Sequence, residues 1–416
     1  MSNKLKIILA ALILLPPLLY FGAGLLLARG KTLEERHVDF DEPPFDFNSD
    51  SFDDYILYSQ ARLLAARVGA LDQGMLDNLS PFELQPGPEC PRLPDGRAQR
   101  GILLTHGLLE SAFSMRDFGA FLQTQCFHVV GLLLPDHGSR PGDFLSTDWR
   151  EYSAAIAFGT RVLGSKAGQV LLGGHSMGGA LSILEASRNA DVEGLILFAP
   201  ALAITDAARY ARFIVPLGKL FPGAAWVGVD ADEALYRYES LTFTAASETW
   251  ALLQAVRAAE NPQVQQLPIL TVASMQDTTV STPAILDFMQ RNTHTASLTL
   301  LYSQHDQQGS ERLRVLPAAD ADAGILSLSH LGLMTPPDNP YYGRDGEYRN
   351  CGHYGSAANP DFVACKNGRR DWYGETTAEN RAAGVLERIA FNPAYDAMTQ
   401  EVLAFIGRLS AQDARR

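Results

Sequence analysis

The 416-residue sequence is poor in cysteine and in positive charge, and both shortages exclude classes of function. Its four cysteines include no C-x-x-C pair, so the sequence does not favour a zinc site, and we predict no metal. Acidic residues outnumber basic ones by 47 to 34, which gives a formal net charge of −13. Binding to nucleic acid, or electrostatic attraction to anionic lipid head groups, needs a basic surface. We therefore expect no nucleic-acid partner.

Charge is absent altogether from residues 7–28, an apolar run interrupted only by prolines and glycines. Such a run is long enough to span a bilayer and longer than the apolar region of a usual cleaved signal peptide. Lys4 and Lys6 precede it, and no convincing A-x-A cleavage site follows. We predict a membrane anchor over residues 1–28, with a cleaved signal peptide and secretion as the alternative. Either way, the remaining chain lies on the periplasmic or extracellular side.

The motif Gly174-His175-Ser176-Met177-Gly178 is the most informative stretch of the chain. An apolar run over residues 169–173 precedes it, and a helix-like run over residues 179–185 follows. This is the G-x-S-x-G nucleophile elbow, a sharp turn that leaves room only for small residues two positions before and after the serine. The alternative is a chance match in a chain with 35 glycines. The flanking strand and helix argue against chance.

A nucleophilic serine needs a base to take its proton and an acid to orient that base. After a nucleophile elbow, the chain order is serine, acid, histidine. Residues 267–274 form a short apolar run that predicts a buried strand, and Asp277 follows it. Catalytic groups gather at the carboxyl ends of parallel strands, so Asp277 is the candidate acid. The alternative role for Asp277 is a turn or helix cap before Pro283.

The base must come from the histidines after Asp277, which are His294, His305, His330 and His353. His330 follows the apolar run 324–329 and precedes more aliphatic residues, which suits a groove for an acyl chain. His305 follows the predicted strand 297–302 and lies in a polar stretch that is typical of an exposed turn. We take His330 as the base and keep His305 as the alternative.

The developing oxyanion needs two preorganised N–H donors, one after the nucleophile and one from a loop after an earlier strand. Met177 supplies the first by its position. Residues 100–105 read as the earlier strand, and Gly107 after it allows close approach of the backbone. The N–H group of Leu108 is therefore the second candidate donor. We interpret His106 as a structural imidazole that holds this loop, and not as the base.

Four motifs together resemble the α/β-hydrolase superfamily, and most closely its monoacylglycerol lipase, lysophospholipase and carboxylesterase branch. They are His106-Gly107-Leu108, Leu134-Pro135-Asp136-His137-Gly138, Arg140-Pro141-Gly142-Asp143 and the elbow at Ser176. The resemblance covers roughly residues 95 to 410. The sequence departs from the family at Asp136, where the turn usually has glycine. The spacing from Asp277 to His330 is also longer than the family usually shows, so His305 stays the alternative base.

The resemblance implies an α/β fold with a mostly parallel central sheet, helices on both faces, a helical cap and, here, an N-terminal transmembrane segment. An acidic linker and N-terminal extension would occupy residues 29–90. The α/β-hydrolase core would span residues 91–204 and 267–416, interrupted by the cap over residues 205–266. A cysteine-containing insertion would occupy about residues 335–380. We also expect a helix over residues 52–68, before the fold starts, and a closing helix over residues 395–409, where apolar residues recur at helical spacing.

The resemblance also implies a pairing for the cysteines. It places the strands that follow Cys90 and Cys126 side by side, which would bring these two residues together, and Cys351 and Cys365 would close a small loop. An even number of cysteines is consistent with export to an oxidising compartment. The alternative is four free thiols.

The resemblance finally implies a Ser176–Asp277–His330 triad that hydrolyses carboxylic esters through an acyl-enzyme, without a cofactor. Acyl glycerols, lysophospholipids or similar esters are the expected substrates. Two alternatives remain at this point. One is a peptidase or amidase of the same fold, and the other is a non-catalytic binding protein with an α/β-hydrolase-like fold.

Overall fold

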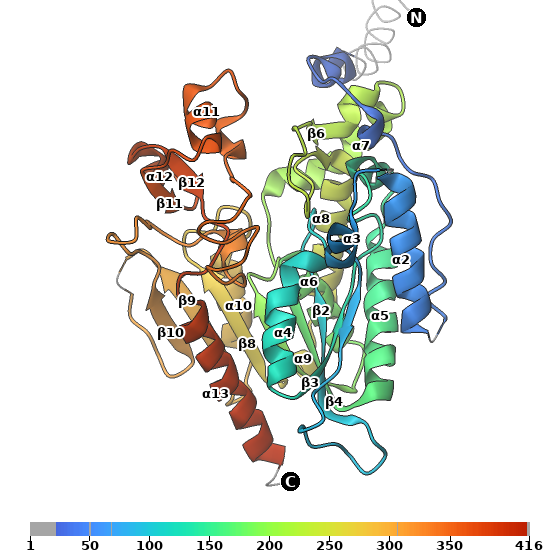
Figure 1. The fold of residues 1–416 in the computed structure, drawn as a ribbon, viewed down its shortest axis with the longest axis vertical. Helices are drawn as coiled ribbons and strands as arrows, with labels where there is room; N and C mark the ends of the chain where they lie inside the picture. The colour runs from blue at the N-terminus through green and yellow to red at the C-terminus, as the bar shows by residue number, and fades with distance from the viewer. Residues whose placement is uncertain (1–21, 50, 68, 306, 414–416) are drawn as a thin grey trace, which may run out of the picture.

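The computed structural model describes residues 22–49, 51–67, 69–305 and 307–413, and its centre is an eight-stranded sheet (Figure 1). The strands lie in the order β1-β3-β2-β4-β5-β8-β9-β10. Their bounds are β1 Phe82–Leu84, β2 Ala98–Thr105, β3 Phe127–Gly131, β4 Ala167–His175, β5 Val192–Phe198, β8 Ile269–Ser274, β9 Leu298–Ser303 and β10 Leu313–Pro317.

All neighbouring strands of this sheet are parallel except β1, which pairs with β3 in the antiparallel sense. Phe82 of β1 lies opposite Gly131, where a Cβ atom would come within 2.2 Å of the Phe82 ring. The sheet therefore begins inside the segment that the sequence predicts as an N-terminal extension. A strand of three residues is too short to stand out from its neighbours in a hydropathy pattern.

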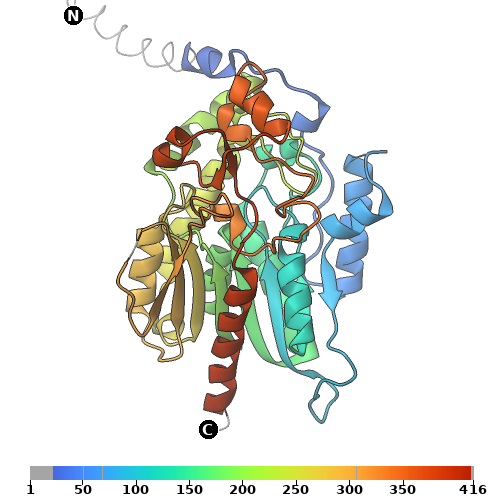
Figure 2. The same ribbon diagram turned by 60° about the vertical axis from the view of Figure 1, so that its left-hand side comes forward.

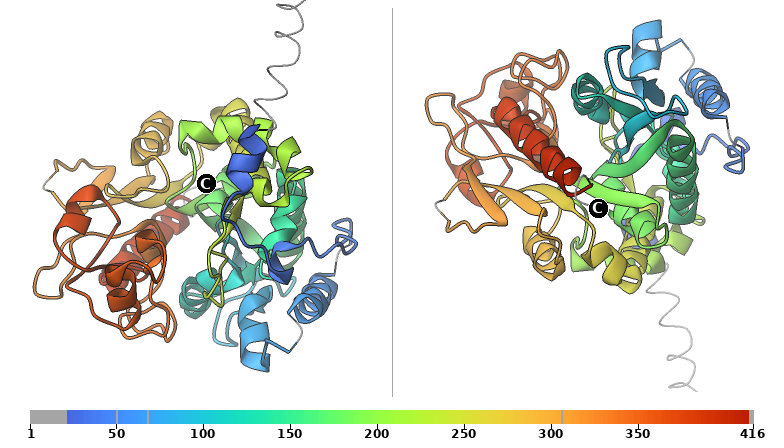
Figure 3. Two further views of the ribbon diagram at one scale, coloured as in Figure 1. Left: turned by 90° about the horizontal axis from the view of Figure 1, so that it is seen from above. Right: turned by 90° about the horizontal axis from the view of Figure 1, so that it is seen from below.

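Helices cover both faces of the sheet (Figures 2 and 3). Burial on both faces explains why the inner strands are continuous apolar runs, with every residue of β8 and β9 buried. The helices predicted over residues 52–68 and 395–409 are confirmed as α2 and α13. Outside the cap and the insertion, the helices are η1 Glu35–His37, α2 Phe52–Ala66, α3 Gln73–Leu79, η2 Ala112–Met115, α4 Arg116–Thr124, η3 Pro141–Leu145, α5 Trp149–Lys166, α6 Met177–Ala186, α10 Thr282–Arg291, η6 His330–Gly332 and α13 Tyr395–Asp413.

Between β5 and β8 the chain leaves the sheet and forms a mainly helical cap. The cap consists of η4 Asp206–Tyr210, α7 Ala211–Gly218, η5 Pro222–Ala225, β6 Trp226–Gly228, β7 Leu241–Thr242, α8 Phe243–Ala259 and α9 Pro262–Gln265. Figures 1 and 2 show the cap and the cysteine-containing insertion at the same end of the molecule.

The insertion folds around a disulfide between Cys351 and Cys365, and a second disulfide joins Cys90 to Cys126. Both predicted pairs are confirmed. Cys126 has a positive φ of 66°, at the turn where α4 leads into β3. The elements from the insertion onward are η7 Gly352–Tyr354, α11 Pro360–Lys366, β11 Trp372–Gly374, α12 Ala378–Ala382 and β12 Leu386–Arg388.

Among the residues that the structure describes, no helix has both the length and the apolar character needed to cross a membrane. Most of the predicted anchor, residues 1–28, lies outside the described residues, which begin at residue 22. Residues 22–28 are helical. Membrane attachment through this segment therefore stays a prediction.

Candidate active site

Ser176 lies at the sharp turn between β4 and α6, with φ 53° and ψ −116°. This is a strained backbone conformation for a residue with a side chain. Crowding explains the two glycines of the motif. A Cβ atom on Gly174 would lie 2.4 Å from the carbonyl carbon of Gly178, and one on Gly178 would lie 2.2 Å from the carbonyl oxygen of Thr105. The N–H group of Ser176 donates to Phe198 O of β5 at 2.9 Å, which fixes the turn to the sheet.

Asp277 follows β8, and both oxygens of its buried carboxylate are engaged. Oδ1 accepts the N–H groups of Thr279 at 2.7 Å and Val280 at 3.0 Å. Oδ2 lies 2.6 Å from Nδ1 of His330. Burial alone would raise the pKa of Asp277, but the His330 imidazole and the two N–H donors hold it below its usual value. The carboxylate is therefore ionised and orients the imidazole.

His330 is held at three points and lies beside the elbow. Besides the contact of Nδ1 with Asp277, its carbonyl oxygen accepts a hydrogen bond from Nε2 of His175 at 3.1 Å. Its ring centroid lies 4.6 Å from that of His175, the residue immediately before Ser176. Its N–H group donates to Glu375 Oε2 at 3.2 Å. The structure thus brings Asp277 and His330 to the same edge of the sheet as Ser176.

His305, the alternative base, does not join this group. Its side chain is 66% exposed in the loop after β9, and its ring lies 3.9 Å from the exposed Glu379. This exposed position agrees with the polar turn that the sequence predicts around it.

The loop after β2 lies against the elbow. A Cβ atom on Gly107 would come within 3.0 Å of Cβ of Ser176, so only glycine lets the loop approach this closely. Leu109 adopts a positive φ of 69°, which turns the chain sharply after Leu108. Met177 begins α6, so its N–H group belongs to the N-terminal end of a helix, where the backbone dipole favours negative charge.

His106 has the structural role that the sequence predicts. Its Nε2 accepts the N–H of Leu134 at 3.0 Å, so Nδ1 carries the proton and donates to Gly107 O at 2.8 Å. Burial lowers its pKa to about 4, which keeps the ring neutral. The imidazole ties the loop after β2 to the chain that leaves β3.

A buried ion pair beneath this loop has no signal in the sequence. Glu110 Oε1 lies 2.8 Å from Nδ1 of His175, while Oε2 accepts Gly107 N–H at 2.9 Å and Ser114 Oγ–H at 3.0 Å. Burial would lower the pKa of His175, but Glu110 raises it above its usual value. The charged pair joins the loop of Gly107 to the elbow and, through His175, to the main chain of His330.

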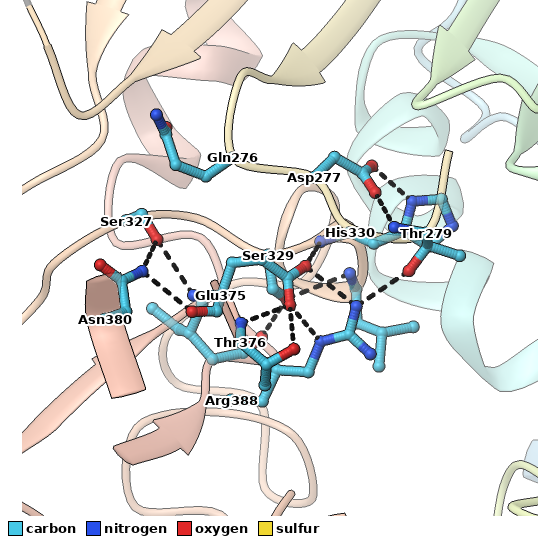
Figure 4. Close-up of polar contacts among 12 residues, drawn as sticks. Gln276, Asp277, Thr279, Ser327, Ser329, His330, Glu375, Thr376, Asn380 and Arg388 are labelled. Carbon is cyan, nitrogen blue, oxygen red and sulfur yellow. Dashed lines mark hydrogen bonds and ion pairs between the residues drawn. The ribbon is translucent and has the colours of Figure 1, made fainter. Parts of the chain in front are cut away.

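A second ion pair, between the buried Glu375 and the half-buried Arg388, lies next to Asp277 and His330 (Figure 4). Arg388 Nε donates to Glu375 Oε1 at 2.8 Å, and its Nη2 donates to Oε2 at 2.9 Å and to Thr279 Oγ1 at 2.9 Å. Glu375 also accepts the N–H of His330. This Glu375–Arg388 clamp connects the loop of Asp277 to His330, and the sequence could not reveal it because Thr279 and His330 lie far from the clamp along the chain.

The model of the alpha/beta hydrolase family matches residues 102–366, well over half of the chain. The chain belongs to this family. Solved structures similar to this hydrolase include that of LipS and LipT, two metagenome-derived lipolytic enzymes, at 20% identity over 58% of this chain and 88% of that one, with a TM-score of 0.44. The monoacylglycerol lipase of Paleococcus ferrophilus matches at 18% identity over 54% and 88%, with a TM-score of 0.42.

A soluble variant of the monoglyceride lipase of Saccharomyces cerevisiae matches at 14% identity over 60% of this hydrolase and 85% of that chain, with a TM-score of 0.41. No curated protein matches the sequence. Within the described residues, no group of three or more histidine, cysteine or acidic side chains could hold a metal ion.

Proposed function

We propose that this hydrolase cleaves carboxylic esters through an acyl-enzyme formed on Ser176. The observation that carries the proposal is the 2.6 Å contact between Asp277 Oδ2 and His330 Nδ1, with the His330 ring beside the residue that precedes Ser176. An ionised carboxylate on Nδ1 fixes the tautomer whose Nε2 accepts a proton.

In the proposed reaction, His330 Nε2 takes the hydroxyl proton of Ser176 as Oγ attacks the ester carbonyl carbon. The N–H groups of Leu108 and Met177 donate to the oxyanion of the tetrahedral intermediate, and Asp277 stabilises the imidazolium. Collapse breaks the bond to the alcohol oxygen, which leaves with the proton from His330. Water then repeats the sequence on the acyl-enzyme and releases the acid.

Acyl glycerols, lysophospholipids or similar esters are the proposed substrates. Apolar side chains of Leu331, Met334 and Ala390 lie close to His330, around a small cavity that polar side chains, Arg237 among them, also line. This apolar wall supports an acyl substrate. An aminopeptidase would need a free carboxylate to bind the substrate amine. The nearby Glu110 does not offer one, because His175, Gly107 and Ser114 already occupy its oxygens. These contacts favour an ester substrate.

We also propose that the chain is anchored in a membrane by residues 7–28, with the hydrolase domain outside the cytoplasm. Two disulfides support an oxidising compartment. Residues 22–28 lie against the cap, where a Cβ atom on Gly24 would come within 2.6 Å of the Phe221 ring. Large apolar side chains are exposed on this part of the molecule, namely Leu25, Leu26, Phe213 and Leu220.

Hydrolysis of p-nitrophenyl esters from acetyl to palmitoyl, with wild type beside Ser176→Ala, tests the proposal. We expect turnover that Ser176→Ala lowers by about a millionfold, since loss of a triad member costs about that much. The chain-length optimum then separates small esters from lipids. Equal activity in the variant, or no turnover on any ester, would contradict the proposal and direct attention to aminoacyl amides.

A further inference from the structure

A cavity of about 240 Å³ lies between the cap and the disulfide-bonded insertion. The cap contributes Arg237 and Glu239, and the insertion contributes Tyr348, Asn350, His353 and Lys366. We call it the cap–insertion cavity. Its lining includes no member of the proposed triad.

Arg237 sits directly over the loop that carries the proposed oxyanion donors. The residues on either side of it are bound to that loop: Ser111 Oγ donates to Tyr236 O at 2.8 Å, and Tyr238 N–H donates to Leu109 O at 2.7 Å. The main chain on both sides of Arg237 is therefore hydrogen-bonded to the loop after β2, which fixes the position of Arg237 relative to that loop. A group held by Arg237 would lie close to the reacting ester.

The other side of the active site also borders the cap–insertion cavity. Arg388 lines it, and Arg388 binds Glu375, which in turn accepts the N–H of His330. The small cavity next to His330, of about 20 Å³, is lined by both Arg237 and Leu331. The cap–insertion cavity thus lies between the oxyanion loop and the segments that support the acid and the base.

The guanidinium of Arg237 has no ion-pair partner among the described residues, although nearby phenol and carboxylate groups favour its charged form and raise its pKa. Its one hydrogen bond to the described residues is from Nε to Tyr238 O, at 3.4 Å. No carboxylate of those residues lies within ion-pair distance. An arginine side chain stays charged at every pH the protein meets and carries five N–H donors. The Nη groups of Arg237 are therefore left for another acceptor.

Two carboxylates act on Arg237 electrostatically, those of Glu110 and Glu239, but both are engaged elsewhere. The carboxylate oxygens of Glu110 bind His175, Gly107 and Ser114, as described above. Glu239 Oε1 accepts the hydroxyl of Tyr348 at 2.8 Å, and its Oε2 accepts the N–H of Glu233 at 2.8 Å. Neither carboxylate forms a hydrogen bond or an ion pair with Arg237.

A further donor in the cap–insertion cavity also lacks a partner. Asn350 is only 7% exposed, and its Nδ2 is buried without a hydrogen bond to the described residues. His353 lines the same cavity, but its ring lies beside the main chain of Leu386, and burial lowers its pKa to about 4. A buried donor without an acceptor is costly, so the amide of Asn350 calls for one.

The acidic side chains around the cavity do not accept hydrogen bonds from these donors. Glu233 pairs with Lys366 at 2.8 Å, and Asp230 is exposed to solvent. The donors without a protein acceptor are thus the Nη groups of the Arg237 guanidinium and the side-chain amide of Asn350. Together they match the oxygens of an anion, and a planar guanidinium is well suited to a carboxylate or a phosphate.

We propose that the cap–insertion cavity binds an anionic carboxylate or phosphate group of the ester substrate, with Arg237 and Asn350 as donors. This inference rests on the proposed function, since it names a substrate class for the same site. The anion could belong to the alcohol, as in a glycerol phosphate, or to the acyl group, as in the half-ester of a dicarboxylic acid.

The test compares anionic and neutral esters on the full chain. One pair is 1-oleoylglycerol 3-phosphate against 1-oleoylglycerol, which places the anion on the alcohol. The other is monoethyl succinate against ethyl butyrate, which places it on the acyl group. The measured quantity is the ratio of kcat/KM for the anionic ester to that for the neutral one, and we expect wild type to prefer the anionic ester in at least one pair.

Arg237→Gln should lower this ratio by about 10- to 100-fold, the usual range for a hydrogen bond to a charged group. Arg237→Lys keeps the charge but loses the planar arrangement of donors, so its ratio should lie between those of wild type and Arg237→Gln. Asn350→Asp should also lower the ratio, because it places a negative charge beside the anion. Arg150→Gln, on an exposed arginine of α5, is the matched control and should leave the ratio unchanged.

A wild-type ratio near one in both pairs would overturn the inference, as would ratios that neither Arg237→Gln nor Asn350→Asp changes. If Arg237→Gln does not fold, Asn350→Asp decides the question alone. Hydrolysis of neutral esters that depends on Ser176 would in these cases leave the proposed function standing. Absence of any Ser176-dependent turnover would instead contradict the proposed function itself.

Discussion

His330 shows, at the scale of a single residue, how much the site depends on contacts from distant segments. Asp277 contacts the ring of His330, His175 donates a hydrogen bond to its carbonyl oxygen, and Glu375 accepts one from its backbone N–H group. Its apolar flanks in the sequence were enough to favour it over His305. The sequence could not exclude His305, because the long spacing from Asp277 to His330 is bridged only in three dimensions.

Replacement of the two histidines separates them as bases. We expect His330→Ala to lower kcat for a p-nitrophenyl ester almost as severely as Ser176→Ala, by about 10⁴- to 10⁶-fold. His305→Ala, on a ring that is 66% exposed, should change kcat less than about twofold. Steady-state kinetics on both variants checks this. The reverse order would move the assignment to His305.

Asp136 is the residue at which the sequence departs from the family, and the structure gives the reason glycine is usual there. Its φ is 65°, in the left-handed region that strains residues with a Cβ atom. Burial also raises its pKa to about 7, although Arg62 lies 3.6 Å away. The folded protein therefore holds this proton more tightly than the unfolded chain, where the pKa of aspartate is about 3.9.

Stability should accordingly fall as the pH rises from about 4 through about 7. Asp136→Asn removes this dependence and keeps a residue that tolerates positive φ. We expect it to raise the free energy of unfolding by about 1–3 kcal/mol at pH 8 and by less at pH 5. Denaturant unfolding at both pH values measures this, with Asp191→Asn as an exposed control. An equal gain at both pH values would contradict the assignment.

At the scale of elements, the sequence predicted what periodicity and apolar runs encode. The strands before Ser176, Asp277 and Gly107 were found because buried parallel strands are continuous apolar runs, and α2 and α13 because they are long. The edge strand β1 was missed because it has three residues. Glu110, Glu375 and Arg388 were missed because a charged residue looks exposed in the sequence until its partner in the fold is known.

The Glu375–Arg388 clamp gives the insertion a role in positioning His330. We expect Glu375→Ala to lower kcat by about 10- to 100-fold with KM changed less than about threefold, since a misplaced base affects the transition state rather than binding. Glu375→Gln, which keeps an oxygen for the N–H of His330, should recover part of the loss. Kinetics on both variants provides the measurement.

Glu387→Ala is the matched control for the clamp. Glu387 is a buried carboxylate of β12 that pairs with Arg370 and Arg349 but does not contact His330. It should destabilise the insertion without a comparable loss in kcat. If the two alanine variants lose kcat equally, Glu375 only stabilises the insertion.

At the scale of the whole molecule, the cap, the insertion and residues 22–28 lie at one end, and the last turns of α13 lie at the other (Figure 1). The two disulfides that the family resemblance implied are present. The apolar run that leads into residues 22–28 would place the cap near a membrane.

Membrane attachment is tested on the full chain with Leu14→Arg and Leu18→Arg together, because each arginine at the centre of a spanning helix costs about 2.5–3.5 kcal/mol. We expect the double variant to leave the membrane fraction after carbonate extraction, whereas wild type stays in it. Leu57→Arg, at an exposed leucine of α2, is the control and should behave as wild type. A double variant that still sediments with membranes would rule out residues 7–28 as the anchor.

Mass spectrometry of the trapped intermediate can reveal the proposed acyl-enzyme on Ser176. Wild type and Ser176→Ala are mixed with a p-nitrophenyl ester, quenched in acid within the first turnovers and digested. We expect an added acyl mass on the wild-type peptide that contains Ser176, and none on the variant peptide. Turnover without this adduct, or an adduct on another residue, would contradict the proposal.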